Sequence, residues 1–246
     1  MTPDYHKHYS KSLERDMEYK VYGTQGHPVL VFPSQDGRFY DWEDFGMVGE
    51  LTPLIDEGSI RLICVDGIDT ETWSQSGGDE HARIIRHEQW FHYVTDELMP
   101  AVRLTADEKF WVTGCSMGGY HAANFFFRRP DLFDTLLSLS GLYGAGFFFP
   151  NYHDPLIYDN SPLDFLRGMP KDHPYMQSYR RRRIVLCVGQ GAWEGELLKD
   201  TRALHAVLRE KEVPAWVDYW GHDVSHDWVW WRRQVVYFMK KLTEKV

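Results

Sequence analysis

The 246-residue sequence contains few cysteines, no long hydrophobic run and no excess of positive charge. Its three cysteines, Cys64, Cys115 and Cys187, form an odd set without the spacing of a disulfide framework, so we expect buried free thiols. The polar N-terminus lacks a stretch of signal-peptide type, and no segment approaches a membrane span in length. These absences predict a soluble protein of a reducing compartment, such as the cytoplasm, without a membrane partner.

Charge and length narrow the class of protein further. The formal net charge is -9, which disfavours nucleic acid as a partner. The arginine run 180–183 stands just before a predicted strand, and we interpret it as a solvated surface. A chain of this length without a recognisable linker predicts one α/β domain over residues 1–246.

The chain is organised around the hexad Gly114-Cys115-Ser116-Met117-Gly118-Gly119. An apolar, strand-like run (110–113) precedes it and a helix-compatible run (120–126) follows it. Gly-x-Ser-x-Gly between a strand and a helix is the pattern of a nucleophile elbow, the sharp turn of the α/β-hydrolase fold that exposes a serine hydroxyl. Ser116 is therefore the candidate nucleophile, and the Met117 amide, at the helix N-terminus, is a candidate oxyanion-hole donor.

The surrounding pattern predicts a mostly parallel central sheet with antiparallel N-terminal strands and helices on both faces. Two alternating stretches between Tyr5 and Tyr22 indicate the antiparallel strands, and later apolar runs indicate strands buried on both faces. Helical spacing covers residues 79–103 and the segments that follow the later strands. The predicted strands after Tyr22 lie at 28–32, 60–65, 110–113, 135–141, 183–188 and 215–220, and further helices begin near 41, 195 and 227.

The loop after the 28–32 strand is expected to supply the second oxyanion-hole amide. Pro33 has no N–H, which leaves Ser34 or Gln35 as the donor. Trp73, in a glycine-rich loop after the next strand, is a candidate pocket wall, with a packing role as the alternative.

Residues 142–180 are rich in aromatic residues and proline and are too long for a simple connection. We interpret them as a small cap over Ser116, with Phe147 as a substrate-contacting residue. A contact between copies of the chain, and hence a homo-oligomer, is the alternative use of the run Phe147-Phe148-Phe149.

The remaining members of a catalytic triad are expected late in the chain, in the order Ser, Asp/Glu, His. Glu194 follows the 183–188 strand and is the candidate acid, with Glu196 and Asp200 as alternatives; the adjacent Trp193 is a candidate substrate contact. The final loop offers two histidines. His226, beside the start of the last helix, is preferred over His222 as the general base.

Two other motifs fail on spacing, so we expect neither a metal nor a cofactor. His87 and His92 are five residues apart, whereas two zinc-binding histidines on one helical face are four apart. A dinucleotide fingerprint that starts at Gly189 would need glycine at position 194, where the chain has Glu194.

The elbow, the late Gly191-Ala192-Trp193-Glu194 segment and the closing run from His226 to Arg232 together resemble the putative esterase family of α/β hydrolases. That family includes S-formylglutathione hydrolases, feruloyl and acetyl esterases, siderophore esterases and mycolyltransferases; relatives often carry Asp where this chain has Glu194. The resemblance implies hydrolysis of a small-molecule ester through an acyl-enzyme. Acyl transfer, thioester hydrolysis and binding without catalysis remain the alternatives.

Overall fold

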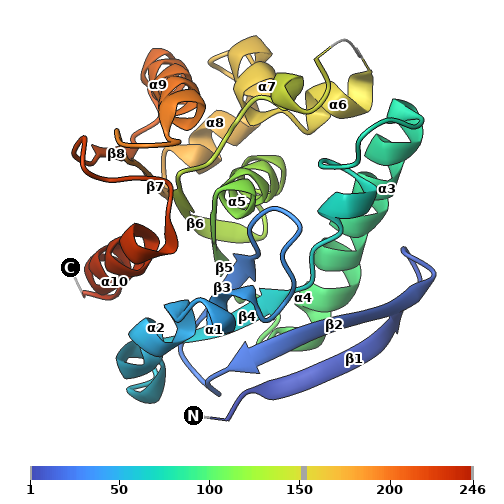
Figure 1. Cartoon of the computed structure of the whole chain (residues 1–246), viewed down its shortest axis with the longest axis vertical. Coiled ribbons are helices and arrows are strands. Elements are labelled where there is room, and N and C mark those ends of the chain that lie inside the picture. The colour runs from blue at the N-terminus through green and yellow to red at the C-terminus, as the bar shows by residue number, and fades with distance from the viewer. Residues whose placement is uncertain (1, 151–153, 245–246) are drawn as a thin grey trace.

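The computed structural model describes residues 2–150 and 154–244, which form one eight-stranded sheet with helices around it (Figure 1). The strand order is β1-β2-β4-β3-β5-β6-β7-β8, in which β1, β2 and β4 pair antiparallel and all later pairs are parallel. The strands are β1 (Asp4–Ser10), β2 (Arg15–Tyr22), β3 (His27–Phe32), β4 (Ile60–Val65), β5 (Phe110–Cys115), β6 (Phe133–Leu139), β7 (Arg183–Val188) and β8 (Trp216–Tyr219).

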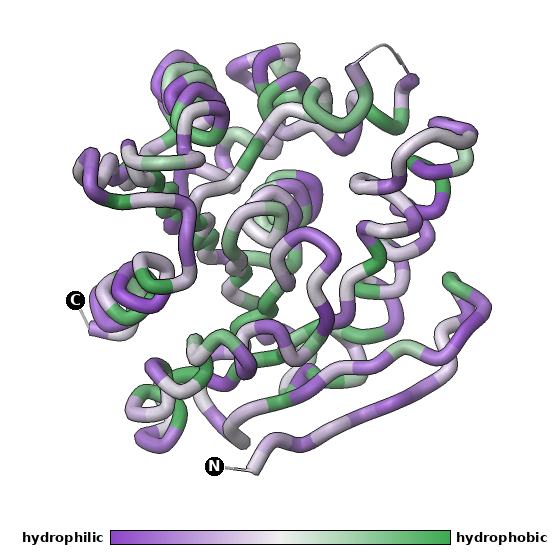
Figure 2. The backbone as a smooth tube through the Cα atoms, in the orientation of Figure 1, coloured by the Kyte–Doolittle hydropathy of each residue, from purple (hydrophilic) through white to green (hydrophobic). Residues whose placement is uncertain are grey.

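The central strands are continuous apolar runs because both faces of the sheet are covered. Every residue of β4 and β5 is buried, whereas the residues of β1, at the sheet edge, are exposed or half-buried except for Ser10. Figure 2 shows the same contrast between the hydrophobic centre and the hydrophilic edge strand. The predicted α/β-hydrolase architecture, with antiparallel N-terminal strands, is confirmed.

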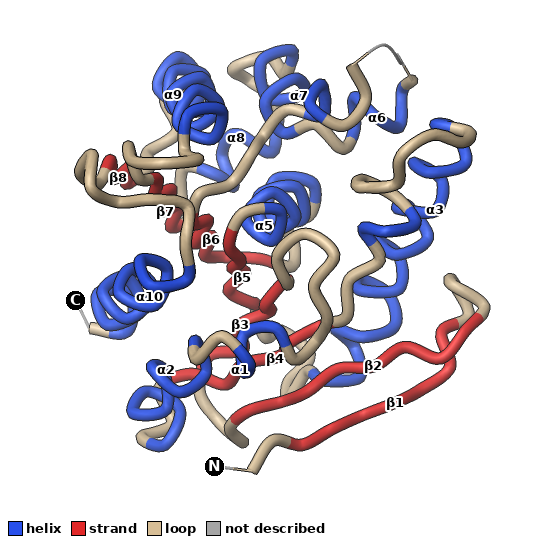
Figure 3. The backbone as a smooth tube through the Cα atoms, in the orientation of Figure 1, coloured by secondary structure: helices blue, strands red, loops and turns tan. Residues whose placement is uncertain are grey.

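The helices lie on both faces of the sheet (Figure 3). One hydrophobic cluster joins the sheet to α3, α5 and α9, and a second joins its other face to α2 and α10. The α-helices are α1 (Asp41–Asp44), α2 (Met47–Asp56), α3 (Glu80–His92), α4 (Met99–Val102), α5 (Met117–Arg128), α6 (Pro155–Asp159), α7 (Pro162–Gly168), α8 (Pro174–Tyr179), α9 (Gly195–Glu210) and α10 (Trp228–Thr243); the shorter helices are η1 (Asp69–Glu71), the π-helical η2 (Tyr93–Leu98) and η3 (Ala145–Phe147).

The helix predicted over 79–103 is confirmed as the continuous run α3, η2 and α4. Its first turn is capped by the Asp79 carboxylate, which accepts from the amides of His81 and Ala82. The wide π-turn precedes Pro100, which has no N–H to donate to the preceding turn. In the described part of the chain, no helix is both long and apolar enough to cross a membrane.

Candidate active site

Ser116 stands on a strained turn between β5 and α5. Its φ of 58° and ψ of -121° lie outside the regions that ordinary residues occupy. The turn requires glycine on either side: a Cβ on Gly114 would lie 2.3 Å from the backbone of Gly118, and a Cβ on Gly118 would lie 2.5 Å from the Phe32 carbonyl oxygen. The glycines of the motif are therefore needed for close backbone packing, and this packing presents the hydroxyl at the strand end.

The tertiary structure brings Ser116 together with His226 and Glu194, which follow it by 110 and 78 residues in the sequence. His226 Nε2 lies 2.9 Å from Ser116 Oγ. On the other side of the ring, Nδ1 lies within ion-pair distance of Glu194 Oε2, at 3.5 Å, and neither of these two buried atoms has a hydrogen-bond partner in the described chain. The imidazole thus bridges the hydroxyl and the carboxylate.

The loops that carry His226 and Glu194 are tied to each other through the backbone. The amide of His226 donates to the Ala192 carbonyl at 2.9 Å, and the amide of Gly191 donates to the Val224 carbonyl at 2.8 Å. A Cβ on Gly189 or Gly191 would lie 2.2 or 2.7 Å from the Val224 oxygen. These two glycines, which imitate part of a dinucleotide fingerprint, instead let the histidine loop approach β7 closely.

The alternative triad residues lie elsewhere. His222 is exposed. Glu196 is exposed and pairs with Lys199, whereas Asp200 Oδ2 accepts from the amides of Tyr143 and Gly144. None of the three alternatives occupies the position beside Ser116 that His226 and Glu194 share.

The loop after β3 is held at Ser34. The Ser34 amide donates to Asp41 Oδ2 at 3.0 Å, and the Ser34 hydroxyl donates to the Cys115 carbonyl at 3.3 Å. The Ser34 amide is therefore already engaged, whereas the amide of exposed Gln35 has no acceptor in the described chain. Met117 is the first residue of α5, so its amide also lacks an intrahelical acceptor.

Burial shifts the pKa values of two groups near the elbow, the Cys115 thiol and the Asp41 carboxyl. Burial raises the pKa of the Cys115 thiol well above its usual value, so this neighbour of Ser116 stays protonated and does not compete as a nucleophile. Burial also raises the pKa of Asp41, with the bond from the Ser34 amide acting in the opposite direction.

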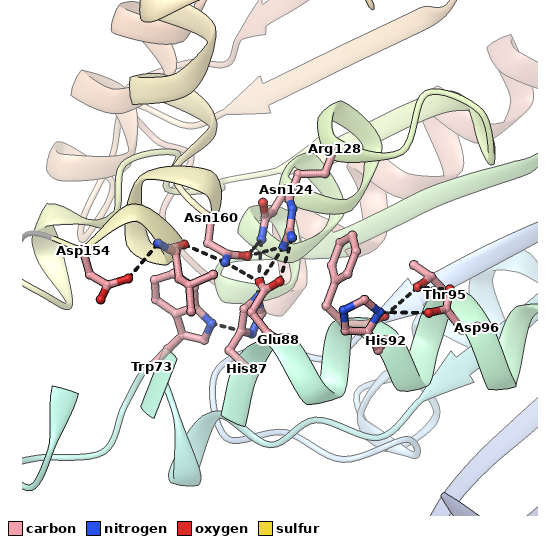
Figure 4. A network of polar contacts seen from close by, with 12 residues as sticks. Trp73, His87, Glu88, His92, Thr95, Asp96, Asn124, Arg128, Asp154 and Asn160 are labelled. Atoms are coloured by element: carbon pink, nitrogen blue, oxygen red, sulfur yellow. Dashed lines mark hydrogen bonds and ion pairs between the residues drawn. The ribbon is translucent and has the colours of Figure 1, made fainter. Parts of the chain in front are cut away.

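The three aromatic residues predicted to contact substrate occupy different environments. Trp73 is 1 % exposed and donates through Nε1 to His87 Nδ1 at 2.9 Å, so the packing alternative describes it (Figure 4). Phe147 and Trp193 are 64 % and 86 % exposed. Trp193 also has a positive φ of 67°, which is unusual for a residue with a large side chain.

The described parts of the predicted cap, 142–150 and 154–180, contain η3 and three short helices that are fastened to the body of the protein, and residues 151–153 of the cap lie outside the described residues. Figure 4 shows Asn160, at the end of α6, between α3 and α5. Its side chain accepts from Arg128 and Asn124 at 2.6 and 2.7 Å and donates to Glu88 at 2.6 Å. Arg128 in turn contacts both carboxylate oxygens of Glu88.

A polar cavity of about 370 Å³ lies at the end of β6, beside the start of α9. It is lined by Leu142, Gly144, Gly146, Phe147, Asp164, Glu196, Lys199 and Asp200. A larger cavity of about 870 Å³ lies near the N-terminal ends of β3 and β7, where His27 and Arg183 line it. That end of the sheet is opposite the elbow, whereas the smaller cavity lies at the C-terminal end of β6, the same end of the sheet as Ser116.

The histidines of the rejected metal motif have other partners. His87 is buried between Trp73 and Asn124, and burial lowers its pKa well below the usual value. His92 lies outside and contacts Asp96. Within residues 2–150 and 154–244, no group of three or more His, Cys, Asp or Glu side chains could hold a metal ion.

The sequence predicts no role at this site for three residues that the structure places here. Ser140 Oγ donates to Glu194 Oε1 at 2.7 Å, and Trp231 Nε1 donates to Ser140 Oγ at 3.1 Å. Asp41 holds the loop after β3. The small residues at the end of the 135–141 strand mark the place of Ser140, but its partner Trp231 is 91 residues away.

Comparisons with known proteins identify the family and the fold. A family model described as "Putative esterase" matches residues 10–242. No curated protein matched the chain. Solved structures with the same fold include a ferulic acid esterase (16 % identity, TM-score 0.77, 98 % of both chains), the S-formylglutathione hydrolase FrmB of Staphylococcus aureus (11 %, 0.72, 99 % of this chain and 96 % of that one) and MPT51 of Mycobacterium tuberculosis (16 %, 0.74, 99 % and 98 %).

Proposed function

The chain belongs to the putative esterase family and is a carboxylic ester hydrolase, and from this premise we propose that it works through a Ser116-His226-Glu194 triad and an acyl-enzyme. The observation that carries the proposal is the position of the His226 ring, 2.9 Å from Ser116 Oγ on one side and 3.5 Å from Glu194 on the other. A nucleophile, a base and an orienting acid in this sequence of contacts constitute a catalytic triad.

In the first half-reaction, Ser116 Oγ attacks the ester carbonyl carbon while His226 Nε2 takes the hydroxyl proton. The imidazolium that forms is stabilised by the Glu194 carboxylate. When the tetrahedral intermediate collapses, the bond from the carbonyl carbon to the alcohol oxygen breaks and His226 gives its proton to that oxygen. Water then attacks the acyl-enzyme with His226 again as the base, which restores Ser116 and releases the acid.

The negative oxygen of the intermediate is bound by the amides of Met117 and Gln35. Both amides are available, because Met117 begins α5 and Gln35 has no acceptor among the described residues, whereas Ser34 already donates to Asp41. Each such donor contributes roughly 3 kcal/mol to lowering the barrier.

Segment 142–180 and the exposed rings at the strand ends form the substrate-binding wall. Phe147 lines the cavity of about 370 Å³ beside β6, and Trp193 directly precedes Glu194. Both rings are largely exposed and can cover the acyl or alcohol group of a bound ester. The substrates that we propose are small or medium-sized esters.

Active-site labelling tests the triad. Wild type and the variants Ser116→Ala, His226→Ala and Glu194→Ala are treated with a fluorophosphonate probe, and the adduct is located by peptide mapping. We expect one adduct, on Ser116, that is absent in Ser116→Ala and forms far more slowly in the other two variants. An unlabelled wild type would contradict the proposal and favour a binding protein on this fold.

Assays with different substrates then distinguish ester hydrolysis from thioester hydrolysis and acyl transfer. p-Nitrophenyl acetate reports ester cleavage, and a matched ester and thioester pair reports leaving-group preference. An added alcohol acceptor tests acyl transfer. Ester hydrolysis requires turnover of the oxygen ester without acceptor; a rate that depends on acceptor would assign transfer instead.

A further inference from the structure

We infer that Ser140 and Trp231 are positioning residues for the triad acid, an assignment that rests on the proposed triad. The side chains form one chain of contacts: Trp231 Nε1 to Ser140 Oγ at 3.1 Å, Ser140 Oγ to Glu194 Oε1 at 2.7 Å, and Glu194 Oε2 to His226 Nδ1 at 3.5 Å. One carboxylate oxygen is thereby held while the other faces the imidazole.

The direction of each proton in this chain follows from the donor inventory. An indole N–H can only donate, so the Ser140 oxygen must accept from Trp231. The hydroxyl has a single proton, and with its oxygen oriented by Trp231 that proton points to the acceptor-only carboxylate. Trp231 therefore favours the hydroxyl orientation in which Ser140 donates to Glu194.

The surroundings of Glu194 leave few other groups to hold it. The side chains of Ser140, Glu194 and Trp231 are 0 %, 1 % and 4 % exposed, so water does not compensate the carboxylate. Glu194 precedes the first residue of α9, where the helix N-terminus favours negative charge, but its side chain caps no amide of that helix. The hydroxyl of Ser140 is its hydrogen-bond donor.

Backbone strain at Ser140 supports a role for the hydroxyl itself. Its φ of 49° is in the left-handed region, which glycine adopts without cost and other residues adopt at a cost. Its amide donates to the Cys187 carbonyl at 2.7 Å, which ties the end of β6 to the neighbouring strand β7. Glycine would suit the backbone better, and what it would lack is the hydroxyl.

Trp231 reaches the triad from a second direction. Its ring packs edge-on against the His226 imidazole, with ring centroids 4.7 Å apart. The tryptophan begins the second turn of α10, the helix that follows His226 directly. One side chain thus orients the donor to the acid and supports the ring of the base.

The strain at Ser140 allows a matched pair of variants. Ser140→Ala removes the hydroxyl and keeps the strain, whereas Ser140→Gly removes the hydroxyl and relieves it. We expect both to lower kcat and kcat/KM for p-nitrophenyl acetate roughly 10- to 100-fold, the factor of one hydrogen bond to an ionised group, with KM within about twofold of wild type. Ser140→Gly should have a higher thermal unfolding temperature than Ser140→Ala, although both variants lose activity. Activity and stability should therefore vary independently in this pair.

Trp231→Phe removes the indole N–H and keeps a ring against His226. We expect a smaller loss of kcat, about threefold to tenfold, and no further loss when Trp231→Phe is combined with Ser140→Ala, because both substitutions break one chain. Additive losses in the double variant would contradict a shared role for the two residues.

The outcomes separate this inference from the proposed triad. If wild type labels on Ser116 and the triad variants fail as expected, but both Ser140 variants keep kcat within twofold of wild type, the inference is overturned and the triad stands. If Ser140→Ala loses activity and Ser140→Gly retains it, the backbone and not the hydroxyl matters, which also overturns the inference. If wild type does not label, the triad itself fails.

Discussion

The Asp41 carboxylate holds the loop that presents the Gln35 amide, and its removal should damage catalysis without damaging the fold. Asp41 Oδ2 accepts from the Ser34 amide at 3.0 Å. The loop closes immediately afterwards through a turn in which the Gly37 amide donates to the Ser34 carbonyl at 2.9 Å. The position of Gln35 inside that turn therefore depends on where Ser34 is held.

The expected loss can be worked from these contacts. A hydrogen bond to a charged group is worth roughly 1.5–3 kcal/mol, and a complete oxyanion-hole donor is worth roughly 3 kcal/mol. In Asp41→Ala the Ser34 amide loses its acceptor, so kcat/KM should fall about 10- to 100-fold, close to the loss of one donor. Asp41→Asn keeps a neutral oxygen acceptor and should lose less than about tenfold.

Steady-state hydrolysis of p-nitrophenyl acetate and the rate of fluorophosphonate labelling measure the effect. Asp44→Ala, which removes an exposed carboxylate from the same short helix, is the matched control and should behave as wild type. If Asp41→Ala keeps kcat/KM within twofold of wild type, then the Ser34 bond does not position the oxyanion hole and the reasoning is refuted.

Three further predictions concern the histidine loop, the 142–180 segment and pH. Gly191→Ala places a Cβ 2.7 Å from the Val224 oxygen and should lower kcat/KM at least about tenfold by displacing the loop of the catalytic base. Asn160→Ala removes a buried amide that donates to the half-buried Glu88 and accepts from the buried Asn124, and it should lower the free energy of unfolding by about 2–3 kcal/mol, measured in urea, with faster proteolysis within 142–180. Burial raises the pKa of Asp41 above its ordinary 3.8, so the native state holds this proton more tightly than the unfolded state. The free energy of unfolding of wild type relative to that of Asp41→Asn should therefore fall as pH rises through the interval above 3.8 and then level off. Urea unfolding from about pH 4 to pH 7 measures this difference.

Each of these predictions has a control within the chain. Gly195→Ala adds a Cβ that meets nothing within 4 Å, so equal losses in Gly195→Ala and Gly191→Ala would contradict the steric argument. Asp159→Ala alters the exposed neighbour of Asn160 and should leave stability unchanged; a comparable loss there would point to a helix effect. A difference in stability between wild type and Asp41→Asn that does not vary with pH would exclude a raised pKa.

The sequence alone determined the features that depend on local geometry. The elbow around Ser116 can be predicted from the sequence because a turn this tight admits only glycine at its close contacts. The glycines in the sequence therefore indicate the conformation. The parallel strands are readable because burial on both faces produces continuous apolar runs such as β4 and β5. Chain order then suggested where an acid and a base would follow, which pointed to Glu194 and His226.

Other features required the tertiary structure because they join residues that the sequence separates. In the folded structure, the Ser34 amide donates a hydrogen bond to Asp41, and this contact distinguishes the Ser34 amide from the amide of Gln35. The sequence left Trp73 open to a pocket role or a packing role, and the structure shows its indole N–H donating a hydrogen bond to His87 on the next helix.

The hydrogen bonds that hold the triad acid, from Trp231 to Ser140 and from Ser140 to Glu194, could be found only in the tertiary structure. Ser140 and Trp231 are 91 residues apart, and although Trp231 belongs to the closing run that resembles the esterase family, nothing in that run points to Ser140. Their contact arises because α10 packs on the face of the sheet where β6 ends, so the indole meets the serine hydroxyl there. A local pattern encodes the turn that exposes a nucleophile, whereas the packing of distant elements sets the hydrogen bonds that orient its partners.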